Sequence, residues 1–162
     1  MQNFTNLSEE EEKIFRAQAW AYFALHATQR MQTFQFYVTL ITALVGGAIV
    51  LAKGNFGRGA LEAVGAAVAL TSYVFWKLDC RIRFLIKNAE GALKFLDRSR
   101  ASFCVHGDPH PLDLFSRDDA LRKRRIGLVR FVAGDLSYSD CFNLVYAIFG
   151  YGGVIFVGAV LF

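Results

Sequence analysis

Charged residues are missing from two long stretches of this sequence, residues 33–52 and residues 141–162. A third stretch, residues 59–76, holds a single charge, Glu62, near its start. Twenty apolar and small residues rise about 30 Å as a helix, which is the thickness of the hydrocarbon core of a bilayer. Buried helices of a soluble bundle rarely lack charge over such a length. We therefore favour three membrane spans over a soluble three-helix bundle.

The sequence also lacks the common catalytic patterns. It has no phosphate-binding glycine loop, no G-x-S-x-G, no H-E-x-x-H and no C-x-x-C. Four possible metal ligands alternate along one loop: Cys104, His106, Asp108 and His110. Their spacing fits no common zinc pattern. We predict no catalytic residue, no metal and no cofactor, and expect that the protein is not an enzyme.

Basic residues are distributed unevenly. Residues 1–32 hold three Lys or Arg, the hairpin between the first two spans holds two, and residues 77–140 hold thirteen. The positive-inside rule places residues 77–140 and the N-terminus in the cytoplasm, and the C-terminus at the far face. The first thirty residues begin acidic, so we expect no signal peptide. Because the three cysteines lie in or beside a reducing compartment, we expect no structural disulfide.

The expected fold is an all-α membrane protein with three transmembrane helices, an N-terminal amphipathic helix and a cytoplasmic helical extension. Its parts are an N-terminal helix over 1–30, a hairpin over 31–76 with spans at 33–52 and 59–76, a basic region over 77–140 with a loop at 101–118, and a third span over 141–162. Ser8 and the acidic run after it predict a helix start. The N-terminal segment is either one long helix with the first span or an interfacial helix that bends into it. Ser139 and Asp140 are predicted to cap the last span.

Each span carries one stripe of polar and small residues at helical spacing. The stripes are Thr28, Gln32, Gln35, Thr39, Thr42 and Gly46; then Glu62, Gly65, Ala69 and Ser72; then Asn143, Tyr146, Gly150 and Gly153. Such a stripe indicates either close helix packing or the lining of a water-filled path. The two glutamines favour water at the first stripe, because amides are poor lipid-facing groups.

Two further patterns lie in the basic region. The first is a heptad seam formed by Leu78, Ile82, Leu85, Ala89, Ala92 and Leu96. It predicts packing against another helix of the chain or self-association as a coiled stalk. The second is the basic run Arg122, Lys123, Arg124 and Arg125. This run is typical of lipid-headgroup contact, of a site for an anionic small molecule or oligonucleotide, or of a solvated helix face.

Residues 78–93 read LDCRIRFLIKNAEGAL. This segment resembles one that follows the second span in small bacterial anti-phage membrane effectors, such as the Hailong channel and retron-associated or SLATT-like proteins. The matching positions are Leu78, Asp79, Arg81, Leu85, Ile86, Glu90, Ala92 and Leu93. Where that pattern has Asn after the Arg, this chain has Ile82. The resemblance covers about a tenth of the chain.

The resemblance implies an oligomer, with a tetramer favoured, in the bacterial inner membrane. It also implies a partner nucleotidyltransferase whose nucleotide or oligonucleotide product gates the channel. The ligand-binding residues would then be Arg81, Arg83, Arg122, Lys123, Arg124 and Arg125. Depolarisation and growth arrest would follow when infection is sensed.

The first functional hypothesis is therefore an oligomeric channel or pore, because three spans are too few to enclose a pore alone. Its predicted pore-lining residues are Gln32, Gln35, Thr39, Thr42 and, at the far mouth, Glu62. Its predicted gating residues are Glu9, Glu10, Glu11 and Glu12, which would contact basic cytoplasmic residues and hold a closed state. The alternative is a non-conducting membrane adaptor that recruits a soluble partner through the heptad seam of residues 78–96. A small transporter or membrane enzyme would need buried polar chemistry that the sequence does not show.

Overall fold

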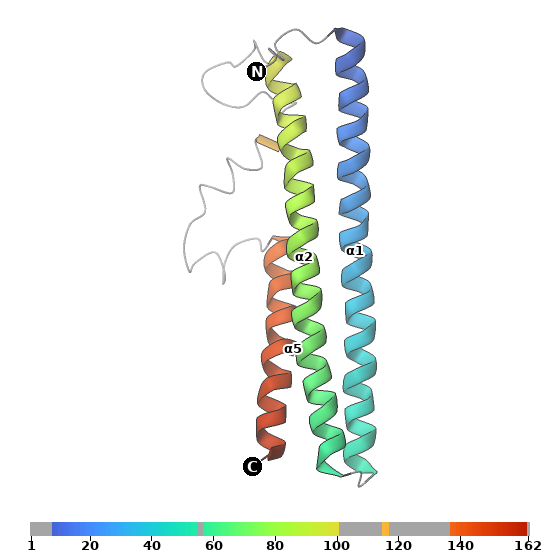
Figure 1. The fold of residues 1–162 in the computed structure, drawn as a ribbon, viewed down its shortest axis with the longest axis vertical. Helices are drawn as coiled ribbons and strands as arrows, with labels where there is room; N and C mark the ends of the chain where they lie inside the picture. The colour runs from blue at the N-terminus through green and yellow to red at the C-terminus, as the bar shows by residue number, and fades with distance from the viewer. Residues whose placement is uncertain (1–7, 55–56, 101–114, 117–136, 162) are drawn as a thin grey trace. The chain divides into compact units, whose positions relative to one another are not determined.

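The computed structural model describes residues 8–54, 57–100, 115–116 and 137–161. It contains three long helices, α1 (Glu9–Lys53), α2 (Arg58–Arg100) and α5 (Tyr138–Leu161) (Figure 1). Each of them contains a segment long and apolar enough to cross a membrane. The prediction of an all-α protein with three possible membrane spans is therefore confirmed for the described residues. α1 and α2 each continue well beyond the length that a bilayer requires.

α1 begins with a reciprocal capping box. The backbone N–H and the hydroxyl of Ser8 donate to the Glu11 carboxylate at 2.9 Å and 2.8 Å, and the Glu11 N–H donates to the Ser8 hydroxyl at 3.3 Å. These hydrogen bonds lower the pKa of Glu11 below its ordinary value. No Gly or Pro interrupts the sequence before Gly46, and α1 is one helix through to Lys53. Of the two alternatives for the N-terminal segment, the structure has the continuous helix.

A short turn joins α1 to α2, as predicted from its glycines. The Gly54 N–H donates to the carbonyl of Val50 at 3.0 Å, which closes the last turn of α1. The Ala60 N–H donates to the carbonyl of Gly57 at 3.0 Å, which opens α2. So short a connection makes the first two spans an antiparallel helical hairpin.

The chain divides into two compact units. The first combines residues 1–28 with residues 83–135, and the second combines residues 29–82 with residues 136–162. In the first unit, Arg16 of α1 pairs with Asp97 of α2 at 2.5 Å. The second unit contains the three apolar helix segments, and it holds the residues predicted to line a pore.

The core of the second unit is aromatic. Its buried cluster consists of Tyr37, Ile41, Val68, Phe142 and Tyr146, contributed by all three helices. The ring of Phe34 stacks on that of Phe142 with centroids 3.8 Å apart and an interplanar angle of 5°. These contacts fix which face of α1 points toward α2 and α5.

The cap of α5 differs from the predicted one. The Ser137 hydroxyl donates to the Asp140 carboxylate at 2.8 Å, and the Asp140 N–H donates back to that hydroxyl at 3.3 Å. Asp140 therefore takes part as predicted, whereas Ser139 does not. The Ser139 hydroxyl instead accepts a hydrogen bond from Arg30.

Candidate pore stripe and buried charge cluster

The stripe on the first span lies on a face of α1 that the described part of its own chain leaves exposed. Its six members are exposed: Thr28, Gln32, Gln35, Thr39, Thr42 and Gly46. The Thr39 hydroxyl donates to the carbonyl of Gln35 at 3.0 Å and the Thr42 hydroxyl to that of Val38 at 2.8 Å. The threonines are thus satisfied within α1, but the amide side chains project outward. In a bilayer, exposed amides require water or another protein beside them.

The stripes on the second and third spans pack against each other. A Cβ atom on Gly153 would lie 2.8 Å from the carbonyl oxygen of Gly65 and 2.9 Å from the backbone nitrogen of Ala69. Gly150 lies against Ser72, whose Cβ would be 3.5 Å from an added Cβ. The backbones of α2 and α5 are therefore in direct contact. At these glycines the structure has close packing, whereas Asn143 lines a cavity of about 410 Å³ together with Ser72, Tyr146 and Gly150.

A buried hydrogen bond joins the first two spans. The hydroxyls of Tyr37 and Ser72 lie 2.9 Å apart, and both residues are buried. Since the Ser72 hydroxyl donates to the carbonyl of Val68 at 2.8 Å, the proton between the two side chains comes from Tyr37. Both polar groups are thereby satisfied inside an apolar core.

A buried ion pair lies where the spans end. The Nε of Arg30 donates to Oδ1 of Asp79 at 2.6 Å, and an Nη donates to Oδ2 at 3.3 Å. The same Nη donates to the Ser139 hydroxyl at 3.1 Å, and the guanidinium lies 5.0 Å from the ring centroid of Phe142. The side chains of Arg30 and Asp79 are 13% and 2% exposed. One guanidinium therefore ties α1, α2 and α5 together.

This charge cluster was not predicted from the sequence, although a signal for it exists. Arg30 lies three residues before the first predicted span, and Asp79 lies three residues after the end of the second. In an antiparallel hairpin these positions come to the same level at the membrane boundary. Two opposite charges at that level can pair and leave water together, whereas either alone would be costly to bury.

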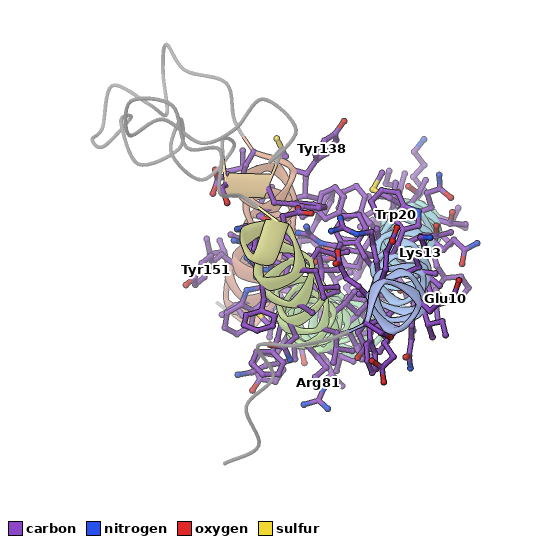
Figure 2. All side chains as sticks on the ribbon, turned by 90° about the horizontal axis from the view of Figure 1, so that it is seen from above. Glu10, Lys13, Trp20, Arg81, Tyr138 and Tyr151 are labelled. Atoms are coloured by element: carbon purple, nitrogen blue, oxygen red, sulfur yellow. The ribbon has the colours of Figure 1, made fainter. Side chains whose placement is uncertain are left out.

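The predicted ligand-binding residues are not brought together by the described part of the chain. Arg81 is exposed and projects from α2 (Figure 2), and it belongs to the second unit. Arg83 is half-buried and belongs to the first unit. The run 122–125 lies outside the described residues, as do Cys104, His106, Asp108 and His110. Glu62, predicted at the far mouth, is half-buried near the start of α2.

The predicted gating residues make their described ion pairs within α1. Glu9 pairs with Lys13 at 3.3 Å and Glu12 with Arg16 at 3.2 Å; Glu10 and Lys13 project from the helix (Figure 2). Arg16 also donates to Asp97, and this hydrogen bond, more than any other contact, raises the pKa of its guanidinium. In this charge link between α1 and α2 of the first unit, the cation is Arg16 of α1 and the anion is Asp97 of α2. Contact between Glu9–Glu12 and basic residues of the cytoplasmic region stays a prediction.

The heptad seam of α2 is largely used within the chain. Ile82, Ala89 and Leu96 are buried, and so is Leu93, which was not assigned to the seam. Leu78 and Ala92 are exposed. This pattern agrees with packing against another helix of the same chain. It leaves little of the seam open to a soluble partner.

Comparison with known proteins shows a similarity that extends over most of the chain. A protein of Escherichia coli named CD-NTase-associated protein 19 is 34% identical over 138 residues, which cover 84% of this chain and 83% of the relative. No known family model matches the chain. No solved structure matches it either.

Proposed function

Because this chain belongs to the family of CD-NTase-associated protein 19, we propose that it acts in anti-phage defence as a pore-forming membrane protein under the control of a nucleotide signal. The name of the relative supports a nucleotide-synthesising partner, which the resemblance of residues 78–93 also predicts. The Hailong, retron-associated and SLATT-like types stay alternatives within this proposal. The chain itself has no catalytic role here.

The observation that carries the proposal is the exposed stripe of α1. Gln32 and Gln35 project from a helix whose surroundings in a bilayer would otherwise be hydrocarbon. In the comparable stripes of α2 and α5, the glycines Gly65, Gly150 and Gly153 pack against the opposite helix. The stripe of α1 is therefore the surface best suited to line a water-filled path.

Such a path needs several copies of the chain, and we propose a homo-oligomer in the bacterial inner membrane, as a tetramer by resemblance. Glu62 would form a ring of carboxylates at the far mouth and favour cations. Arg81, Arg83 and the run 122–125 would bind the anionic signal. Opening would depolarise the membrane and arrest growth.

The test is conductance of the purified protein in planar bilayers. Gln35→Leu and Thr39→Leu should each reduce conductance without changing oligomer size, because they replace pore-facing polar groups by apolar ones. Glu62→Lys should shift selectivity away from cations. A purified oligomer that conducts nothing would contradict the pore and leave the adaptor function.

Accessibility to a water-soluble thiol reagent locates the path. In a background without native cysteines, Gln35→Cys and Thr39→Cys should react in the active state. The matched control is Phe36→Cys, since Phe36 is 63% exposed but lies about 100° around the helix from Gln35. If Asn143→Cys and Gly150→Cys react while the first-span positions stay silent, the path belongs to α5.

A further inference from the structure

The stripe of α1 continues toward the N-terminus with the same alternating spacing of four and three. The positions that extend it are Ile14, Gln18, Ala21 and Leu25, and all four are exposed. Ile14 is 62% exposed and Leu25 is 63% exposed. Together with the span positions they form one heptad repeat from Ile14 to Gly46, which we call the outer seam. Helices with such a repeat pack against one another as coiled coils.

The outer seam is separate from the face that α1 uses within its own chain. In the first unit that inner face includes Arg16 and Phe23, which contact Asp97 and Phe115. In the second unit it includes Tyr37 and Ile41, which are buried. Arg16, Phe23 and Tyr37 each lie two positions, about 200° around the helix, from the nearest seam members, and Ile41 lies about 100° from Thr42. α1 thus has a second face, which the described part of its own chain leaves exposed.

The chemistry of the outer seam is inverted relative to its surroundings. Three of the four seam positions that extend the stripe, Ile14, Ala21 and Leu25, are apolar and the fourth is Gln18, whereas Gln32 and Gln35 at the start of the membrane-spanning part are polar. In a single copy, the apolar residues before the span would be exposed to water and the glutamines of the span would be exposed to lipid, and both exposures are unfavourable. A common axis shared by several copies of α1 removes the apolar half from water and the polar half from lipid.

We propose that the outer seam is the interface between copies of this chain, with parallel α1 helices around the oligomer axis. Ile14 and Leu25 then form apolar rings that close the cytoplasmic end of the conduit, because narrow apolar constrictions exclude water. The apolar closure of the water-filled path rests on the proposed pore function, whereas the interface along the outer seam does not depend on it. The competing occupant is the membrane surface, against which an amphipathic helix can also lie.

Disulfide cross-linking in membranes tests the seam. In full-length protein without native cysteines, oxidised Ile14→Cys and Leu25→Cys should each give cross-linked dimers. Lys13→Cys is the matched control, because Lys13 is well exposed but lies about 100° from Ile14 on the helix. Equal cross-linking at Lys13, or none at Ile14 and Leu25, would overturn the proposal. Labelling of Leu25→Cys by a lipid-soluble reagent, without dimers, would assign this face to the membrane surface instead.

Conductance distinguishes failure of the proposed interface from failure of the proposed pore. Leu25→Ser should raise basal conductance severalfold at unchanged oligomer size, because a polar ring admits water. Cross-linking at the seam without any conductance would retain the interface and contradict the pore. Conductance without cross-linking at the seam would retain the pore and contradict the interface. Unchanged basal conductance of Leu25→Ser in a conducting, cross-linked oligomer would contradict the apolar closure.

Discussion

Loss of one partner of the Arg30–Asp79 pair should destabilise the protein strongly. Both side chains are almost entirely removed from solvent, and the two hydrogen bonds between them are 2.6 Å and 3.3 Å long. Removing one member of such a pair leaves an uncompensated buried charge, which costs about 3–5 kcal/mol. Arg30→Met should show the larger loss, because the Asp79 side chain is 2% exposed and loses both hydrogen bonds from the guanidinium. Asp79→Leu should cost less, because the long Arg30 side chain can extend toward the aqueous boundary.

The double variant Arg30→Met with Asp79→Leu should recover most of the lost stability. Replacing both charges by apolar groups removes the desolvation cost along with the attraction, and such exchanges are often neutral. Arg16 and Asp97 provide the matched control, because they form the same kind of pair between the same helices but are 37% and 22% exposed. Arg16→Met should therefore cost only about 1 kcal/mol or less.

The free energy of unfolding is measured by titrating the purified protein in mild detergent with a denaturing detergent and following helix content. Oligomer size is recorded alongside, so that subunit dissociation is not counted as unfolding. If Arg30→Met costs no more than Arg16→Met, the pair is not desolvated in the folded protein. If the double variant is as unstable as the worse single variant, the loss comes from packing around Phe142 rather than from an unpaired charge.

Three further predictions concern other parts of the chain. Gly153→Ala should destabilise the protein by about 1–3 kcal/mol, because the added methyl group meets backbone atoms of α2, whereas Gly152→Ala has open space and should be nearly neutral in the same titration. The lowered pKa of Glu11 adds stability above the ordinary carboxyl pKa of 4.5, which is lost as the pH falls through the lower folded value; Ser8→Ala should raise that pKa in an NMR titration, and an unchanged value would contradict the capping assignment. Deleting residues 1–12 should increase toxicity on expression if the acidic segment holds a closed state, and unchanged growth at equal protein level would argue against gating.

The sequence was sufficient to predict α1, α2 and α5 because their signals are local. Uninterrupted apolar length predicts the spans, and Ser8 with the acidic run predicts the start of α1. The pairing of Gly65 with Gly153 was not predictable, since small residues at helical spacing suit packing and a water path equally well. What decides between these alternatives is which helix lies opposite, and that depends on contacts far apart in the sequence.

The charge cluster was missed for a related reason. Arg30 and Asp79 are 49 residues apart, and each has an adequate local explanation as a charge at the end of a span. Only the register of the hairpin brings them to one level. The predicted capping serine of α5 was wrong for a similar reason. Ser137 and Ser139 are equally suitable capping residues by type, and a hydrogen bond from Arg30 of another helix engages Ser139.

The hydrogen bond between Tyr37 and Ser72 also bears on how the protein enters the bilayer during synthesis. Both groups belong to the first two spans, so the hairpin can satisfy its most deeply buried hydroxyls before α5 has been translated. Arg30 gains its main partner, Asp79, from the same hairpin. When α5 arrives, it adds the Ser139 hydroxyl, the ring of Phe142 and a glycine surface, none of which carries a charge that must cross the membrane. Insertion can therefore proceed as a pair of helices that satisfies Tyr37, Ser72 and Arg30 within itself, followed by a third helix with no charged residue after Asp140.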